Sequence, residues 1–465
     1  MARVTRSAAL QSGLASAWGV ALIACGGDAP APAATPPASP ATVAPASPAT
    51  VAPAPTVQAA PAPTAVPLPS GPFPYKVRSG TYFAAGERLE WTNKTAEEFN
   101  RINGARVTIE NQLLAGNYTE TLIASVAAGT SPDVVRTSGA WFSDFIDKGN
   151  LVELGPYVKR DKLDPAQWYQ QDEMLFRKGK QYAMPFWQAH SVYLYNKTMF
   201  TNAGIKPPDN DNWTWSDLLD AAQKLTKPGV SYGIQMGNGF EFSWLNFMRS
   251  AGEDYINPDR SKTTLNNAGA IEVFQWLVDL HQKYKVHPVP DDKSLGEGDF
   301  WLQGKIGMRL GGTGLVGSTL NAKTDFEWDM FVTPKHPKSG KRGITANENS
   351  TVAINQTKNP EAAYLVTKFY AEKYAQDLLG KLRINTPSLK ASAADPASWL
   401  ATPPASMKLT LEQMKHAGTL SFHLNWLQWY NEITKQMLPA FRGEISVREA
   451  CDKASQIGDT LLRGA

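Results

Sequence analysis

The chain has 465 residues, with 46 lysines and arginines against 43 aspartates and glutamates, a formal net charge of +3. This balance gives no steering field for nucleic acid or for an anionic membrane surface, so neither is expected as a partner. Only two cysteines are present, Cys25 and Cys451, which is too few for a disulfide framework.

The chain begins with the features of an export signal. Arg3 and Arg6 precede an apolar run, 15–24, that is shorter than the about 20 residues needed to span a bilayer. Residues 22–25 read LIAC and resemble a bacterial lipobox, where the signal is cut and a diacylglycerol is attached to the cysteine. We therefore predict a signal peptide over 1–24 and a lipid anchor (palmitate-type acylation) at Cys25. A plain secretory signal with a chance cysteine is the alternative.

Residues 25–72 are predicted to form a disordered linker. The segment is rich in alanine and proline and repeats ASPATVAP over 38–45 and 46–53. Such a composition favours extended polyproline II, which rises about 3.1 Å per residue. The remaining residues, 73–465, are too many for one core and suit two domains.

Past residue 73, short apolar strands alternate with longer amphipathic helices. The pattern predicts strands at 75–83, 106–112, 133–135, 191–195, 232–236 and 306–310, with a loop at 136–140. It predicts helices at 86–103, 119–128, 141–149, 214–225 and 268–285. This alternation is typical of α/β folds built from βαβ units with a mostly parallel sheet. Ligands bind at the carboxyl ends of such strands.

Eight runs of the sequence, taken in order, resemble the extracellular solute-binding proteins, family 1, of ABC sugar importers. The runs are 127–135 (AAGTSPDVV), 149–154, 179–185, 194–200, 213–219, 300–308, 358–363 and 443–446. The resemblance implies a two-lobed, periplasmic-binding-protein-like α/β fold in which two domains close around a solute. It also implies that the chain passes from one lobe to the other at three places, which are just after Pro185, near 348–351 and near Gly418. The first lobe is then 73–185 and 350–418, and the second is 186–349 and 419–465.

Segments that cross between the lobes should line the cleft, which selects candidate solute contacts. These are Trp187, Gln188, Asn347, Glu348 and Asn349. A flat indole covers the C–H face of a sugar, and amides and carboxylates bind its hydroxyls, so these residue types suit a carbohydrate.

Further candidates lie where strands end or where the last crossing helix begins: Trp141, Phe240, Glu241, Trp244, Gly312, Trp426 and Trp429. Each tryptophan has a competing interpretation as core. Residues 312–314 (GTG) and 138–140 (SGA) replace a tryptophan and a charged pair of the maltose-binding members. These departures disfavour maltodextrin and leave a carbohydrate open.

No catalytic, cofactor or metal motif stands out. The stretch 312–317 spells GxGxxG, which alone is a weak nucleotide signal, and the six histidines show no metal-ligand spacing. We predict a monomeric, extracytoplasmic substrate-binding lipoprotein that catalyses nothing, captures a mono- or oligosaccharide and delivers it to an ABC permease. Alternatives are a binding protein for a polyol phosphate or peptide, or an exported polysaccharide-degrading lipoprotein whose carboxylates, Glu241 and Glu348, meet across the cleft.

Overall fold

The structure is a computed structural model that describes residues 74–104, 106–169, 175–237, 240–420 and 426–463. Every described residue belongs to one compact unit, 64–465. The predicted signal peptide, Cys25 and the linker lie outside the described residues. Among the residues that are described, no helix combines the length and apolarity needed to cross a membrane.

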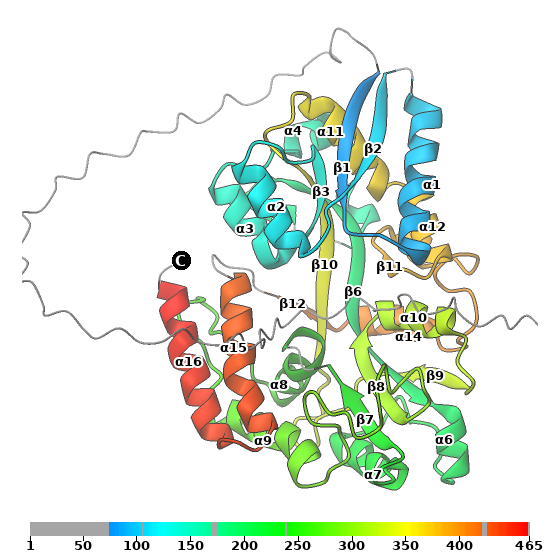
Figure 1. The fold of residues 1–465 in the computed structure, drawn as a ribbon, viewed down its shortest axis with the longest axis vertical. Helices are drawn as coiled ribbons and strands as arrows, with labels where there is room; N and C mark the ends of the chain where they lie inside the picture. Colours follow the sequence, from blue (N-terminus) through cyan, green and yellow to red (C-terminus); the bar gives the residue numbers. More distant parts are fainter. Residues whose placement is uncertain (1–73, 105, 170–174, 238–239, 421–425, 464–465) are drawn as a thin grey trace, which may run out of the picture. The chain divides into compact units, whose positions relative to one another are not determined.

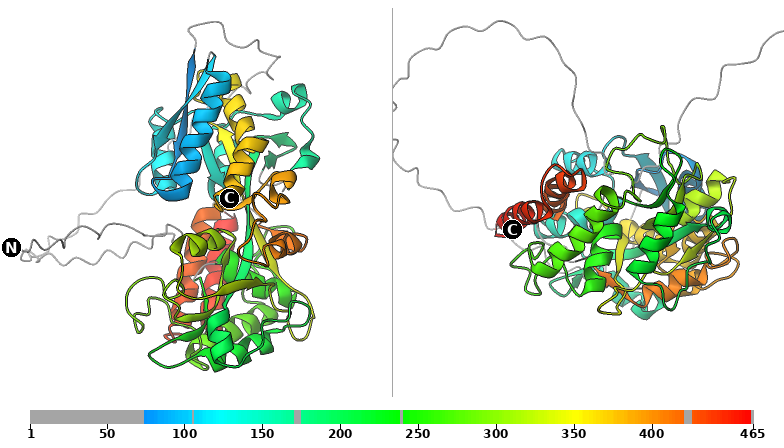
Figure 2. Two further views of the ribbon diagram at one scale, coloured as in Figure 1. Left: turned by 90° about the vertical axis from the view of Figure 1, so that its right-hand side faces the viewer. Right: turned by 90° about the horizontal axis from the view of Figure 1, so that it is seen from below.

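The first part of the described chain builds a parallel β-sheet. Its strands are β1 (Tyr75–Thr81), β2 (Val107–Leu113) and β3 (Val134–Ser138), in the order β2-β1-β3. Helix α1 (Gly86–Asn103) lies beside α11 (Pro360–Ala371) and α12 (Lys373–Lys381) (Figures 1 and 2). The Phe99 and Phe369 rings join α1 to α11 edge to face, with centroids 5.3 Å apart.

Two long strands run side by side through the middle of the sheet (Figure 1). Strand β6 (Ala183–Asn196) is buried over its whole length. Its first half pairs antiparallel with β10 (Ile344–Ala353), and its second half pairs with β8 (Ile306–Gly312) and β9 (Trp328–Phe331). Strand β7 (Tyr232–Met236) continues the sheet, parallel to β8.

The other elements connect or cover these strands. Those before β10 are α2 (Tyr118–Ala127), α3 (Gly139–Asp147), α4 (Gly155–Arg160), η1 (Pro165–Gln167), β4 (Phe176–Arg177), β5 (Lys180–Gln181), α6 (Lys197–Asn202), α7 (Trp215–Leu225), η2 (Phe240–Trp244), α8 (Leu245–Ala251), α9 (Ala268–Gln282) and α10 (Gly314–Ala322). Those after α12 are β11 (Thr386–Pro387), α13 (Lys390–Ala393), α14 (Lys408–Met414), β12 (Ala417–Thr419), α15 (Trp426–Phe441) and α16 (Val447–Arg463).

Hydrophobic cores lie at both ends of the sheet. The two clusters of the first half draw on residues between 77 and 187 and between 352 and 389. The two clusters of the second half draw on 192–331 and 399–454. Trp399 and Met407 pack with Val192 and Leu194 in the second half, although both residues fall within 350–418, a segment predicted to belong to the first lobe. The lobe boundaries themselves stay a prediction.

The sequence pattern located most elements but missed how the two halves are joined. The helix at 86–103 and the strand at 232–236 have the predicted bounds, and Thr214 caps α7 through reciprocal bonds with Asp217. The expectation of a mostly parallel sheet is wrong at β6 and β10, because β10 runs antiparallel to β3 and to β6, and β6 runs antiparallel to β8. The predicted loop at 136–140 is also wrong at its start, because 136–138 extend β3 and pair with β10.

Candidate functional site

Residues from two of the predicted crossing segments meet where β6 and β10 pair. Trp187 lies opposite Asn349, Gln188 opposite Glu348, and residue 189 opposite Asn347. The backbone shows an irregularity just beyond Asn349. Because successive residues of a strand point to opposite faces and directly opposed residues share a face, Trp187 and Asn349 lie on one face of the sheet and Gln188 on the other.

Trp187 is fully enclosed in the structure. Its exposed fraction is 0%. The indole packs against Phe186, with ring centroids 4.6 Å apart, and stacks on Phe83 at 5.8 Å. Its N–H finds no hydrogen-bond partner among the described residues. An unpaired buried donor is rare in native proteins, so this N–H is the unusual feature of the ring.

Gln188 is held in place by three neighbouring segments of the chain. Its amide nitrogen donates to the carbonyl oxygen of Tyr169 at 2.8 Å, and its backbone pairs with Thr386 of β11. The Thr313 hydroxyl donates to the Gln188 carbonyl oxygen at 3.3 Å. The side chain is 2% exposed, so its orientation is fixed by the loops around the crossing strand.

Gly312 lies close to the crossing as well. It ends β8 and pairs with Ser191 of β6, and the next backbone N–H, of Thr313, donates to the His190 carbonyl oxygen at 2.9 Å. A Cβ atom at Gly312 would meet the Phe242 ring at 3.3 Å, so any side chain here would crowd that ring. Burial lowers the pKa of His190 to about 3, which keeps the ring neutral at pH 7.

Three of the predicted tryptophans lie elsewhere, in the core of the second half. Trp244 stacks on Phe441 with centroids 4.9 Å apart and an interplanar angle of 10°. Trp426 and Trp429, at the start of α15, stack on each other at 5.3 Å. All three are at most 3% exposed. Their role as solute contacts stays a prediction.

Four predicted contacts have side chains outside the described part of the structure: Trp141, Phe240, Glu241 and Glu348. Their backbone positions are in α3, η2 and β10. The carboxylate pair of the polysaccharide-degrading alternative stays a prediction, since it consists of two of these side chains.

Asn246 of α8 was missed by the sequence interpretation. Its Oδ1 accepts from the Thr345 N–H at 2.8 Å and contacts the Ser191 hydroxyl at 3.0 Å, and its amide nitrogen donates to the Phe242 carbonyl oxygen at 3.0 Å. One buried amide thereby ties η2 to both crossing strands. The residue sits in an apolar helical stretch, and no sequence signal distinguishes it from an ordinary helix position.

Comparison with known proteins connects this arrangement to one family. The family described as "bacterial extracellular solute-binding protein" matches residues 85–377. The diacetylchitobiose-binding protein of Streptomyces coelicolor is 22% identical over 299 residues, 61% of this chain and 67% of that protein.

Solved structures show the same fold. An ABC substrate-binding protein of Listeria monocytogenes, in complex with cycloalternan, superposes with a TM-score of 0.76 at 22% identity, covering 83% of this chain and 98% of that one. The cyclic α-maltosyl-1,6-maltose-binding protein of Arthrobacter globiformis gives 0.69 at 21% identity, covering 84% and 100%. The two halves of the sheet are thus the two lobes of this fold.

Proposed function

Because the chain belongs to the bacterial extracellular solute-binding protein family, we propose that it captures a carbohydrate outside the membrane and delivers it to an ABC permease. In this proposal the protein catalyses no reaction. Closure of the two lobes around the solute is the signal that the permease reads.

The observation that carries the proposal is the pairing of β6 with β10. It gathers Trp187, Gln188, Asn347 and Asn349 at the crossing between the lobes. Amide groups match the paired donor and acceptor character of sugar hydroxyls. The Trp187 N–H, which lacks a partner among the described residues, is a donor that a solute hydroxyl would satisfy when the lobes open and close again.

The names of similar proteins also favour a saccharide. The proteins from Streptomyces, Listeria and Arthrobacter bind diacetylchitobiose, cycloalternan and a cyclic maltosyl-maltose. These three are oligosaccharides, whereas the sequences are at most 22% identical to this one. The class of ligand is therefore supported more strongly than any individual sugar.

Lipid attachment at Cys25 would hold the protein at the outer side of the cytoplasmic membrane. The proline-rich segment 25–72 then serves as the tether that lets a monomeric binding domain reach its permease. Its composition supports this role, because polyproline II keeps a chain extended without internal hydrogen bonds.

A thermal-shift screen followed by calorimetry tests the proposal. The panel holds neutral monosaccharides, oligosaccharides, a polyol phosphate and short peptides, and each mixture is analysed by chromatography for products. A solute at 100 times its dissociation constant should stabilise the protein by about 2.7 kcal/mol. We expect a saccharide to bind and to be recovered intact. Hydrolysis products would favour the polysaccharide-degrading alternative, and binding of only the phosphate or a peptide would favour the non-sugar alternative.

A further inference from the structure

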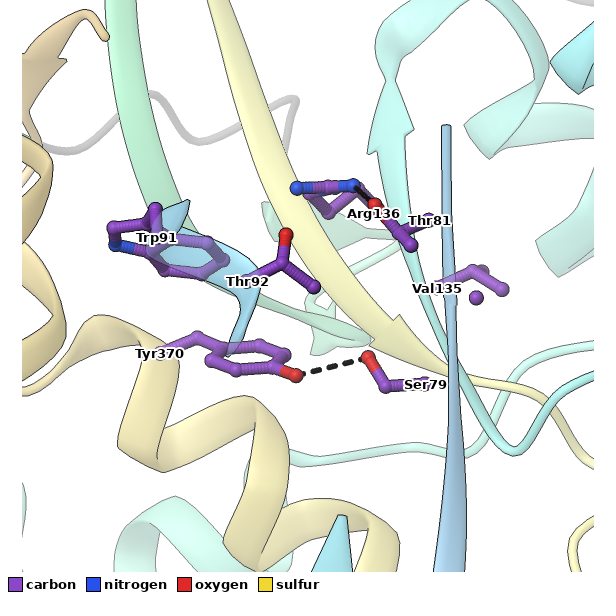
Figure 3. Close-up of a pocket in the computed structure, with 8 residues that line it drawn as sticks. Ser79, Thr81, Trp91, Thr92, Val135, Arg136 and Tyr370 are labelled. Atoms are coloured by element: carbon purple, nitrogen blue, oxygen red, sulfur yellow. Dashed lines mark hydrogen bonds between the residues drawn. The ribbon is translucent and has the colours of Figure 1, made fainter. Parts of the chain in front are cut away.

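A small buried cavity lies in the first lobe, between the sheet and α1. Its volume is about 10 Å³, and it is lined by Ser79, Thr81, Trp91, Thr92, Arg136 and Tyr370 with Gly80 and Val135. Figure 3 shows side chains from β1 and β3 facing others from α1 and α11 across this space. A volume near 10 Å³ is about the size of one water molecule, so the cavity can hold one small species.

Arg136 brings a charge into this enclosed place. The residue is 5% exposed, and its guanidinium donates to the Thr81 hydroxyl oxygen. Three aromatic rings cover it: the guanidinium carbon is 3.5 Å from the ring centroid of Phe83, 5.0 Å from that of Tyr82 and 5.4 Å from that of Phe186. The Nε–H has no hydrogen-bond partner among the described residues.

No carboxylate of the described residues forms an ion pair with Arg136. Burial lowers the pKa of the Arg136 guanidinium, and a second cation, Arg88, acts in the same direction. The Tyr118 hydroxyl donates to the Arg136 backbone carbonyl oxygen at 2.7 Å. Aromatic faces attract a cation but carry no net charge. A buried cation normally has an anion as partner, because removal from water is costly otherwise.

A hydroxyl pair beside the cavity supplies a further donor. The hydroxyl oxygens of Ser79 and Tyr370 lie 2.9 Å apart, and either can be the donor (Figure 3). Whichever oxygen accepts keeps its own O–H hydrogen, which is then available for another acceptor. Thr92 already donates to the Arg88 carbonyl oxygen at 2.9 Å. The cavity therefore offers a charged N–H and one hydroxyl hydrogen, a set of donors that calls for an acceptor.

We propose that this cavity binds a small monovalent anion of the halide class, held by the Arg136 Nε–H and by the hydroxyl pair of Ser79 and Tyr370. A water molecule could accept the same hydrogen bonds but would leave the charge uncompensated. Sulfate and phosphate are too large for the space. A chloride ion is somewhat larger than water, so we expect the hydroxyl groups to move slightly outward around it.

Crystals of the wild-type protein grown or soaked in bromide test the proposal directly. We expect an anomalous bromide peak in the cavity, within hydrogen-bond distance of Arg136. The same data without any peak there, and with ordinary water density in its place, would overturn the proposal. This measurement does not depend on any variant folding.

Thermal unfolding at constant ionic strength provides the second test. Sodium chloride is exchanged for sodium methanesulfonate, whose anion is monovalent and too large for the cavity. The wild-type midpoint should rise with chloride, and Arg136→Gln should need at least tenfold more chloride for the same rise. The matched control is Arg160→Gln, which removes an arginine of the same lobe paired with Glu361 and Asp161 and should keep the wild-type chloride response. Equal midpoints of the wild type in both salts would contradict the proposal.

Discussion

The indole ring of Trp187 stacks on the phenyl ring of Phe83, with centroids 5.8 Å apart and an interplanar angle of 17°. Trp187 belongs to the crossing strand β6, whereas Phe83 follows the end of β1. The stack therefore joins the crossing strand to the carboxyl edge of the parallel strands, where α/β proteins bind their ligands. A change at Trp187 should affect both the fold and the proposed solute contact.

Replacing Trp187 by alanine should lower the free energy of unfolding by about 3–5 kcal/mol, because the ring is fully buried. Trp187→Phe keeps an aromatic ring against Phe83 and should cost less, while it removes the N–H proposed to bind a solute hydroxyl. We expect Trp187→Phe to weaken saccharide binding about tenfold, as measured by calorimetry on the folded protein.

The control for this experiment is Trp168→Phe. Trp168 is buried in the same cluster, but its N–H already donates to the Ala371 carbonyl oxygen at 2.8 Å. This variant should lose stability and bind the solute as the wild type does. If Trp187→Phe also loses stability and keeps the wild-type affinity, Trp187 is a core residue and does not contact the solute.

Asn246→Ala should destabilise the junction of the crossing strands. The variant removes the acceptor of the buried Thr345 N–H and the donor to the Phe242 carbonyl oxygen. Each buried group left without a partner costs about 1–3 kcal/mol, and urea unfolding measures the sum. Ser191→Ala removes only one of the contacts to this amide and should cost less. A free energy of unfolding within about 0.5 kcal/mol of wild type for Asn246→Ala would show that the hydrogen bonds of this amide do not stabilise the junction.

Mildly acidic pH should destabilise the protein through buried histidines. Burial lowers the pKa of His281 from 6.5 to about 4, and burial together with the neighbouring His281 lowers that of His287. The unfolded chain then binds protons that the folded chain does not. Stability is full above about pH 6.5 and falls as the pH drops toward 4, by up to about 1.4 kcal/mol per pH unit for each histidine.

Urea unfolding between pH 7 and pH 4.5 measures this slope. His281→Gln should reduce the slope of the free energy of unfolding against pH by up to about 1.4 kcal/mol per pH unit, the equivalent of one proton. Carboxylates titrate in both proteins, so they do not contribute to this difference. Identical slopes for the wild type and His281→Gln would mean that His281 is protonated equally in the folded and unfolded chain.

Small-angle X-ray scattering should show a smaller radius of gyration when the right saccharide is bound. A solute that touches both lobes binds the closed form better and shifts the population toward it. The comparison uses the full chain after signal removal, with and without a saturating amount of the solute found by the screen. An unchanged radius with a tightly bound solute would point to a rigid site within one lobe.

Cys25→Ala should abolish lipid attachment. Labelled palmitate should enter the wild-type protein in the bacterium and fail to enter the variant, which is then recovered uncleaved or released from the membrane. Cys451→Ala is the matched control, because Cys451 is buried in α16 and should not alter labelling. Label in the Cys25→Ala protein, or none in the wild type, would refute the lipobox assignment.

Local chemistry was readable in the sequence wherever a short segment decides its own structure. The periodicity of 86–103 predicts a helix with the observed bounds. The reciprocal bonds between Thr214 and Asp217 and the Asn359 cap before Pro360 likewise act within a few residues. The same local signals predicted the alternation of helices and strands. The family was predicted from the eight sequence runs that resemble solute-binding proteins.

Only the tertiary structure decided how distant segments meet. Strands 183–196 and 344–353 lie more than a hundred residues apart in sequence, yet their antiparallel pairing sets Trp187 against Asn349. The enclosure of Trp187 depends on Phe83 and Phe186 together, and the isolation of Arg136 from any described carboxylate depends on the strands and helices that surround it. Periodicity predicts which face of an element is buried, whereas the neighbours of a side chain follow from packing across the whole chain.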